Sequence, residues 1–194
     1  ARQRIYKSAT LGEGGDPERI IGRKKIERIP APEGWDKQGI GRRFFVFPMR
    51  VWDEATSLNL AISWVTKFDR ALFLTPSNRD ADTIKDGIRG LPATQSHTLF
   101  EAAQLEASKK SFTQAGPAIA VLANRYDGID LSGDECRYLI IYGLPESTKL
   151  QERFIISRLG ASVLFQVRIR TRITQAVGRC TRSATDYALV VIIG

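Results

Sequence analysis

Short apolar segments alternate with longer segments of helical period from about residue 41 onward, and this alternation limits the possible folds most. Two of the six apolar segments, Ala118–Ala123 and Tyr138–Tyr142, contain scarcely a polar position. Such strands are typical of a parallel sheet that helices cover on both faces. The other four candidate strands are Phe44–Phe47, Ala71–Thr75, Thr94–His97 and Tyr187–Ile193. The pattern predicts an α/β fold with a doubly wound, mostly parallel sheet and helices on both faces.

The segments between these strands carry the signals of helix starts. Asp53 can cap a helix in which apolar residues recur at steps of three and four. Two capping-box patterns, at Ser77–Asp80 and Thr98–Glu101, predict the starts of two more helices. Further helical stretches are expected up to about Gln114, over Ser147–Arg158, and in a longer segment that ends near Arg182.

Residues 1–40 do not follow this alternation, because glycines, prolines and charges are scattered through them. They are typical of an edge segment and linker. We therefore predict two parts, residues 1–40 and a domain over residues 41–194. The chain begins without Met and enters a motif-like stretch almost at once, so we expect it to be a piece of a longer protein.

Composition narrows the classes of function. The 29 Lys and Arg against 21 Asp and Glu give a net charge of +8. Basic residues gather in residues 1–50 and again in residues 151–182, where seven arginines stand against one acid. This distribution favours an anionic partner, either nucleic acid or nucleotide phosphate, over a merely solvated basic surface. Two cysteines and one histidine exclude a disulfide framework and a metal cluster built from them, and they favour a reducing, cytoplasmic setting. No apolar run is long enough to span a membrane.

The segment Gln175–Arg182 is the most informative one. At 100° per residue, Gln175, Arg179 and Arg182 fall on one face of a helix. Arg168 and Arg172 join this face if the helix is continuous, whereas apolar residues occupy the adjacent face. Four arginines without an acid repel one another on a free helix, so we expect this face to meet phosphates, which guanidinium groups bind with two parallel hydrogen bonds.

A second constellation, Asn124–Asp134, directly follows an apolar strand. It therefore lies at the carboxyl end of a parallel sheet, where such folds bind ligands. Gly128 and Gly133 allow close approach of a ligand to the backbone, and Asp130 can accept a hydrogen bond from a ribose or an arginine. The sequence contains no G-x-x-x-x-G-K-[ST] phosphate loop.

Together these segments resemble superfamily 2 helicases. Ser8–Leu11 is similar to motif III, Ala71–Ser77 to motif IV, Asn124–Gly133 to motif V and Gln175–Arg182 to motif VI, all in the expected order. Gly-Ile-Asp-Leu within motif V and Gly143-Leu-Pro after the next strand resemble the XPD and DinG branch most. The resemblance implies a RecA-like, P-loop NTPase fold, with residues 1–40 ending the first RecA-like domain and residues 41–194 forming the second.

The resemblance also implies roles for single residues. Arg179 and Arg182 would reach the γ-phosphate of ATP, Gln175 would position that phosphate or the attacking water, and Gly128 and Asp130 would sense the nucleotide. ATP and Mg²⁺ would be bound mainly by the first domain. An iron–sulfur cluster, which some members contain, would also lie in that domain, so residues 1–194 do not indicate whether one is present. The remaining implied roles are coupling of the two domains by Ser8 and Thr10, and nucleic-acid contacts, to DNA in this branch, by Thr75, Ser77, Asn124 and Arg125.

Two other interpretations stay open on the sequence. The same motifs occur in translocase subunits of restriction or remodelling systems, which follow DNA without separating its strands. The missing phosphate loop, taken literally, fits a stand-alone module that binds nucleic acid or a nucleotide without hydrolysis. A phosphate loop and an acidic Walker B segment upstream in the parent protein would favour the motor.

Overall fold

The computed structural model describes residues 41–126, 129–145, 162–181 and 183–194, together with short pieces of the first 34 residues. Of residues 162–165, 167 and 168 it describes the backbone. The chain divides into two compact units, residues 1–38 and residues 39–194. Within the first unit, Arg28 Nη2 and Glu18 Oε2 form an ion pair at 3.1 Å. The second unit contains the sheet.

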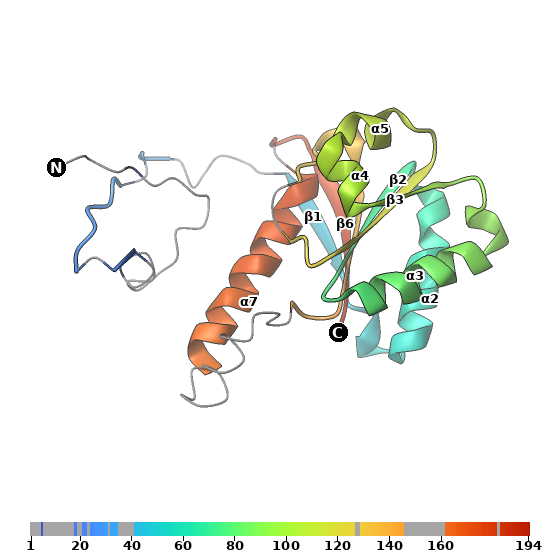
Figure 1. The fold of residues 1–194 in the computed structure, drawn as a ribbon, viewed down its shortest axis with the longest axis horizontal. Coiled ribbons are helices and arrows are strands. Elements are labelled where there is room, and N and C mark those ends of the chain that lie inside the picture. The colour runs from blue at the N-terminus through green and yellow to red at the C-terminus, as the bar shows by residue number, and fades with distance from the viewer. Residues whose placement is uncertain are drawn as a thin grey trace. The chain divides into compact units, whose positions relative to one another are not determined.

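Six strands form this sheet in the order β1-β6-β5-β2-β4-β3 (Figure 1). They are β1 (Arg42–Val46), β2 (Arg70–Thr75), β3 (Thr98–Glu101), β4 (Ala118–Ala123), β5 (Tyr138–Tyr142) and β6 (Tyr187–Ile193). Every neighbouring pair is parallel; on β2, for example, Leu72 lies in register with Ala120 of β4 and with Leu139 of β5. The predicted α/β fold with a parallel sheet is confirmed.

Helices cover both faces of the sheet. They are α2 (Glu54–Trp64), α3 (Asn78–Gly90), α4 (Ala102–Ala107), α5 (Lys109–Gln114) and α7 (Ser162–Val177). The connections from β1 to β2 and from β2 to β3 pass through α2 and α3, which pack on the face that includes Phe73. The connections from β3 to β4, from β4 to β5 and from β5 to β6 run the other way across the sheet and pass over the opposite face. On that face Leu72 lies in one core with residues of α4, α5 and α7. Parallel crossovers of one hand require this division.

The strand predicted at Thr94–His97 is wrong, because β3 begins at Thr98. The hydroxyl of Thr94 donates to carbonyls of the preceding segment, 2.8 Å from that of Leu91, and closes a 3₁₀ turn after α3. β3 forms where its residues pair with β4, starting with Thr98 opposite Ala118. Pairing therefore overrides the capping pattern at Thr98, and the true capping box joins Glu101 to Gln104 at the start of α4.

The helix expected up to Arg182 is also shorter than predicted. α7 ends at Val177, and Gly178–Cys180 form a 3₁₀ turn, so Gln175 and Arg179 do not share one continuous helical face. Glycine is a poor helix former, which explains the position of the break. The helix expected up to Gln114 is divided at Ser108, whose Oγ accepts the Lys110 amide at the start of α5. The helix predicted over residues 147–158 lies outside the described residues.

Candidate functional site

The carboxyl ends of β2 and β5 lie side by side, and the chain leaves these two strands in opposite directions across the sheet. Such a switch point is where α/β sheets bind ligands. Gly143, directly after β5, has a φ of 74°, and a Cβ there would lie 2.9 Å from Cγ of Pro76. Only glycine combines this φ with so close a contact, so the turn after β2 is held tightly against the end of β5.

The turn from β2 into α3 contains Thr75 and Ser77, two of the predicted nucleic-acid contacts. Thr75 is fully buried, and its hydroxyl donates to the Ser77 carbonyl at 2.9 Å. Ser77 caps α3, because its Oγ accepts the Asp80 amide at 3.2 Å and donates to Asp80 Oδ2 at 2.6 Å. Thr75 thus shapes the turn and presents no surface to a ligand, which corrects the predicted direct contact. Ser77 lies at the surface of the same turn.

Asn124 and Arg125, the other two predicted contacts, follow β4 beside this turn. Asn124 has a φ of 54°, a conformation that asparagine tolerates better than most residues, and its amide donates to the Thr75 carbonyl at 2.8 Å. Arg125 forms an ion pair with Glu106 of α4, and both side chains are about half exposed. An exposed pair contributes at most about 1 kcal/mol. Arg125 can therefore exchange Glu106 for a phosphate at little cost.

A groove of about 540 Å³ opens beside Asn124 and Arg125, between α3 and the ends of β3 and β4. Lys85 of α3 lines it and forms ion pairs with Asp82 at 2.7 Å and with Glu101 at 2.9 Å. Its hydrogen bonds to Asp82 and then to Glu101 raise the pKa of Lys85, so the ammonium group stays charged. The groove offers amide, guanidinium, ammonium and carboxylate groups, a mixture that suits a ligand with both phosphates and hydroxyls.

The end of the Gln175–Arg182 segment is bonded to the Asn124–Gly133 segment; we call them the motif VI and motif V segments after the motifs that they resemble. The Nε of Arg179 donates to the Tyr126 carbonyl at 3.1 Å, and the Leu131 amide donates to the Arg179 carbonyl at 3.0 Å. Arg179 is only 4% exposed, and Tyr126 and Leu131 are buried in the same core. The sequence places Arg179 on a helix face separate from the apolar residues, but in the structure its side chain is buried. Its side chain holds the two motifs together from the inside.

A further contact connects this junction to the outer strand of the sheet. Arg43 of β1 donates from Nε to Thr181 Oγ1 at 2.8 Å, and Thr181 is only 3% exposed. Next to it, Cys180 packs with Cys136 in the core, and both cysteines are free thiols. A hydrogen bond with Cys136, and then burial, raise the pKa of Cys180 well above its ordinary value, so this thiol stays protonated and unreactive.

The remaining predicted residues are only partly described. Asp130 lines a cavity of about 500 Å³ between the motif V segment and α4–α5. At this cavity Lys109 Nζ donates to the Asp130 carbonyl at 3.2 Å and pairs with Glu135 at 2.8 Å. Gln175 lies in the last turn of α7, next to the core residue Ala176. Four predicted residues lie outside the described part of the chain: Ser8, Thr10, Gly128 and Arg182.

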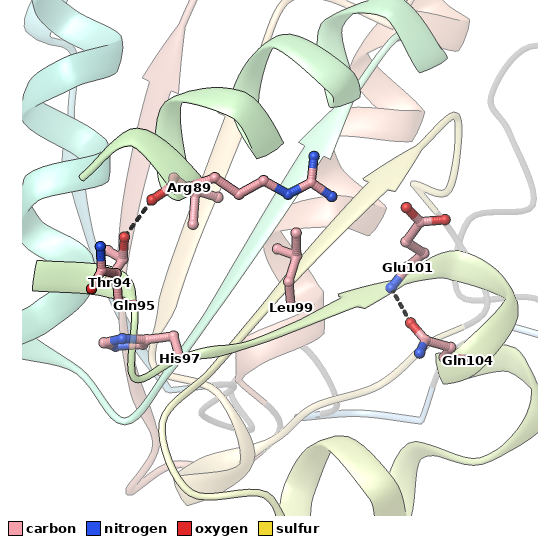
Figure 2. A pocket seen from close by; sticks show the side chains of 8 residues that line it. Arg89, Thr94, Gln95, His97, Leu99, Glu101 and Gln104 are labelled. Carbon is pink, nitrogen blue, oxygen red and sulfur yellow. Dashed lines mark hydrogen bonds between the residues drawn. The ribbon is translucent and has the colours of Figure 1, made fainter. Parts of the chain in front are cut away.

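Another groove, of about 500 Å³, lies against β3 away from these motifs (Figure 2). Arg89 extends over it from α3, while His97, Leu99 and Gln104 line the side of β3 and α4. The Gln104 side chain accepts the Glu101 amide at 2.8 Å, which covers part of this sheet edge. No predicted site residue lines this groove. His97, the one histidine of the chain, lies here and not at the motifs.

Neither a metal centre nor a membrane segment is found in the part of the chain that the structure describes. There, no three His, Cys, Asp or Glu side chains gather closely enough to bind a metal ion. No described helix is both long enough and apolar enough to cross a membrane.

The comparison with protein families decides the class of the domain. A family model described as the helicase C-terminal domain matches residues 61–194, which include β2 through β6 and the segments resembling motifs IV, V and VI. This chain belongs to the helicase C-terminal domain family. It is thus a helicase-type motor domain, and its α/β fold is RecA-like. No significant match is found among curated proteins.

The sequence did not indicate several residues that build this helicase domain site. Tyr126 and Leu131 bond to Arg179 through their backbones, and a backbone contact leaves no mark on residue type. Arg43 and Thr181 are 138 positions apart, and only the pairing of β1 with β6 brings them together. Lys85 had a usable signal, because it follows Asp82 by three positions on a capped helix.

Proposed function

We propose that this chain is the second motor domain of an ATP-dependent nucleic-acid helicase, which acts with a first RecA-like domain of the same parent protein. The junction of Arg179 with Tyr126 and Leu131 carries the proposal. It joins the segment expected to contact ATP to the segment expected to contact nucleic acid. In the same segment as Tyr126, the backbone amide of Asn124 donates to the Thr75 carbonyl at the end of β2. A motor needs such a connection, because ATP hydrolysis at one site has to change the affinity for nucleic acid at the other.

On the nucleotide side, Arg182 contacts the γ-phosphate, and Gln175 positions that phosphate or the attacking water. Gly128 and Asp130 sense the nucleotide, and the cavity beside Asp130 has room and polar groups for one edge of it. ATP hydrolysis supplies the free energy for stepping. The described residues contain no carboxylate cluster for Mg²⁺. The first domain would bind Mg²⁺ and make most of the phosphate contacts.

Arg179 acts in this proposal as a positioning residue. A direct contact with the γ-phosphate would require its side chain, 4% exposed, to leave the Tyr126 carbonyl. With that bond in place, Arg179 fixes the backbone between Gly178 and Arg182, and so sets where Arg182 projects. Ser8 and Thr10 of the segment resembling motif III couple the two domains.

On the nucleic-acid side, Ser77, Asn124 and Arg125 contact the backbone of one strand at the carboxyl edge of the sheet. Thr75 fixes the positions of Ser77 and Asn124, because its hydroxyl donates to the Ser77 carbonyl and its carbonyl accepts the backbone amide of Asn124. Such contacts go to phosphates, so they do not depend on base sequence and weaken as salt rises. The resemblance to the XPD and DinG branch favours DNA as the substrate.

The proposal is tested in the intact parent protein by ATP turnover with and without single-stranded DNA. Arg182→Ala should lower turnover by about 10³- to 10⁵-fold, as expected for an arginine that stabilises charge in phosphoryl transfer. Arg89→Ala is the matched control, because it removes an arginine that is 63% exposed and lies on α3 near the other groove. Near-normal turnover in a folded Arg182→Ala protein would contradict the proposal.

The same preparation separates the two other interpretations. ATP turnover that follows DNA length without strand separation would indicate a translocase. Binding of nucleic acid by an intact parent protein that hydrolyses no ATP would indicate a binding module. Both outcomes would overturn the helicase assignment, and Arg125→Ala would still report whether the carboxyl-edge groove binds the strand.

A further inference from the structure

The large exposed hydrophobic side chains of the sheet domain gather around one edge strand. Six of them, each at least 42% exposed, follow one another along β1 and the turn after it: Phe44, Phe45, Phe47, Met49, Val51 and Trp52. We call this group the β1 patch. Among the described strands β1 pairs only with β6, so no described strand pairs with its outer edge. Single exposed apolar residues are ordinary, but six within residues 44–52 are typical of an interaction site.

Two rings of the β1 patch are already arranged as a stack. The centroids of Phe45 and Phe47 lie 6.3 Å apart, with an angle of 15° between the ring planes. Phe45 is in register with Val190, whose side chain lies in the core that α7 covers. The stack therefore lies on the same face of the sheet as the end of motif VI. Both rings are about half exposed, so each is supported by the protein and still offers surface to a ligand.

An arginine lies beside these rings. Arg50, in the turn after β1, is exposed and forms no ion pair with any residue that the structure describes. The two acids nearest to it in the sequence have other partners, since Asp53 caps α2 through the Thr56 amide and Glu54 accepts the Tyr142 hydroxyl. A guanidinium group without such a partner beside aromatic rings is complementary to a phosphate and a base together.

We infer that the β1 patch is a second nucleic-acid contact, on which unpaired bases of a single strand stack while Arg50 contacts its phosphates. The inference rests on the proposed function and extends it to a surface outside the motifs. Stacking on aromatic side chains beside a basic groove is how proteins hold single strands without reading their sequence.

The position of the β1 patch supports this assignment. Its distal part, from Phe47 to Trp52, lies at the carboxyl edge of the sheet, the same edge as Asn124 and Arg125. Four strand spacings separate β1 from β4, or about 19 Å, a span that a few nucleotides cover. Arg43, on the same face of β1 as Phe45, donates to Thr181 in the segment resembling motif VI. A nucleic-acid strand bound at β1 would therefore contact a β-strand that is hydrogen-bonded to Thr181, two residues after Arg179.

Binding of oligothymidylate to the 194-residue chain tests the inference, measured by fluorescence anisotropy at several salt concentrations. Loss of one stacked base contact weakens binding by about 5- to 150-fold. Phe47→Ala should show this loss, Phe47→Leu should share it because leucine is apolar but has no aromatic face, and Phe47→Tyr should restore binding. An abasic oligonucleotide of the same length should bind all four proteins equally. Arg50→Ala should reduce the slope of log affinity against log salt by about 0.7, the value for one phosphate contact on a single strand.

Tyr187→Ala is the matched control. Tyr187 is an aromatic residue with 47% exposure in the neighbouring strand β6, but it lies at the amino edge, and the Arg137 guanidinium lies 3.8 Å from its ring centroid. Its removal should leave binding unchanged. Trp52 gives an independent readout, because a base stacked on it should quench its fluorescence, and Trp52→Phe should remove that quenching.

The outcomes separate this inference from the function on which it rests. Weaker binding in Arg125→Ala with unchanged binding in Phe47→Ala would refute the β1 patch and leave the proposed function standing. No binding of any oligonucleotide by the wild-type chain at low salt would count against both. If Phe47→Leu binds as wild type, no base stacks on this ring and the inference is wrong. If sedimentation shows that Phe47→Ala dissociates a dimer without affecting DNA binding, the β1 patch is a protein interface and the inference is wrong as well.

Discussion

Replacing Arg179 by alanine separates a buried structural arginine from a surface catalytic one. The substitution removes the Nε–H that donates to the Tyr126 carbonyl, while the bond from the Leu131 amide to the residue 179 carbonyl can remain. On a solvent-facing helix surface the same substitution would hardly affect folding. In the structure it leaves a carbonyl of a buried segment without the donor that the arginine supplied.

The magnitude follows from the burial of this contact. A hydrogen bond from a charged donor contributes about 1.5–3 kcal/mol, and leaving a buried acceptor unsatisfied costs a similar amount. Because Arg179 is 4% exposed, solvent screening does not reduce this value much. Some of the loss is offset, since a buried guanidinium no longer has to be desolvated. We expect the free energy of unfolding to fall by about 1.5–3 kcal/mol, which lowers Tm by about 3–12 °C in a chain of this size.

Thermal unfolding followed by circular dichroism on the 194-residue chain measures this change, with Arg89→Ala as control. Arg89 pairs with Asp86 on the surface of α3, so its loss should cost less than about 1 kcal/mol. Amide hydrogen exchange adds a local readout, because the Leu131 amide should exchange faster in Arg179→Ala. If both arginine variants melt within about 2 °C of wild type, Arg179 does not hold the motif V segment and our account of the junction is refuted.

Two further outcomes follow from single contacts. In a denaturant titration, Gly143→Ala should destabilise the chain by more than about 1 kcal/mol, because the φ of 74° is strained for alanine and its Cβ would lie 2.9 Å from Pro76. The control Gly90→Ala should be neutral or stabilising, because nothing lies within 4 Å of the added Cβ. The hydrogen bond to Glu54 raises the pKa of Tyr142 to about 12, so the folded state retains a proton that the unfolded state loses from pH 10 upward. Stability should therefore fall as pH rises from about 10 to 12, and Glu54→Gln should make this fall shallower when unfolding is measured across that range.

The sequence predicts the central sheet well because burial on both faces dictates residue type. β4 and β5 match their predicted ranges, and β2 differs by one residue, since these strands lie in the middle of the sheet and consist almost wholly of apolar residues. The third strand lies at Thr98–Glu101 and not at the predicted Thr94–His97, because it is a short edge strand with pairing on one side only. Its residues Thr98–Glu101 carry a pattern of a helix start, and nothing local to them records that Ala118 lies opposite.

The candidate site could be predicted as far as side-chain chemistry marks it. Ser77, Asn124 and Arg125 lie together at the carboxyl edge because parallel strands must end on the same side. The burial of Arg179 could not be predicted, since a helical projection assumes that the helix continues and α7 ends two residues earlier. Thr75 shows a similar ambiguity, because a hydroxyl at a strand end fits either a ligand or its own turn; in the structure it donates to the Ser77 carbonyl.

The end of α7 at Val177 gives a last prediction about how the two motifs are connected. In a continuing helix the Arg179 carbonyl would accept the amide of residue 183, but after the break it accepts the Leu131 amide instead. Gly178 favours this break, and alanine prefers a helix over glycine by about 1 kcal/mol. A Cβ at Gly178 would meet nothing within 4 Å, so Gly178→Ala adds helical preference without a clash. We expect the variant chain to be as stable as wild type in denaturant, while the intact parent protein loses part of the stimulation of its ATP turnover by single-stranded DNA. Unchanged stimulation would mean that the bond from Leu131 to Arg179 does not connect the two sites.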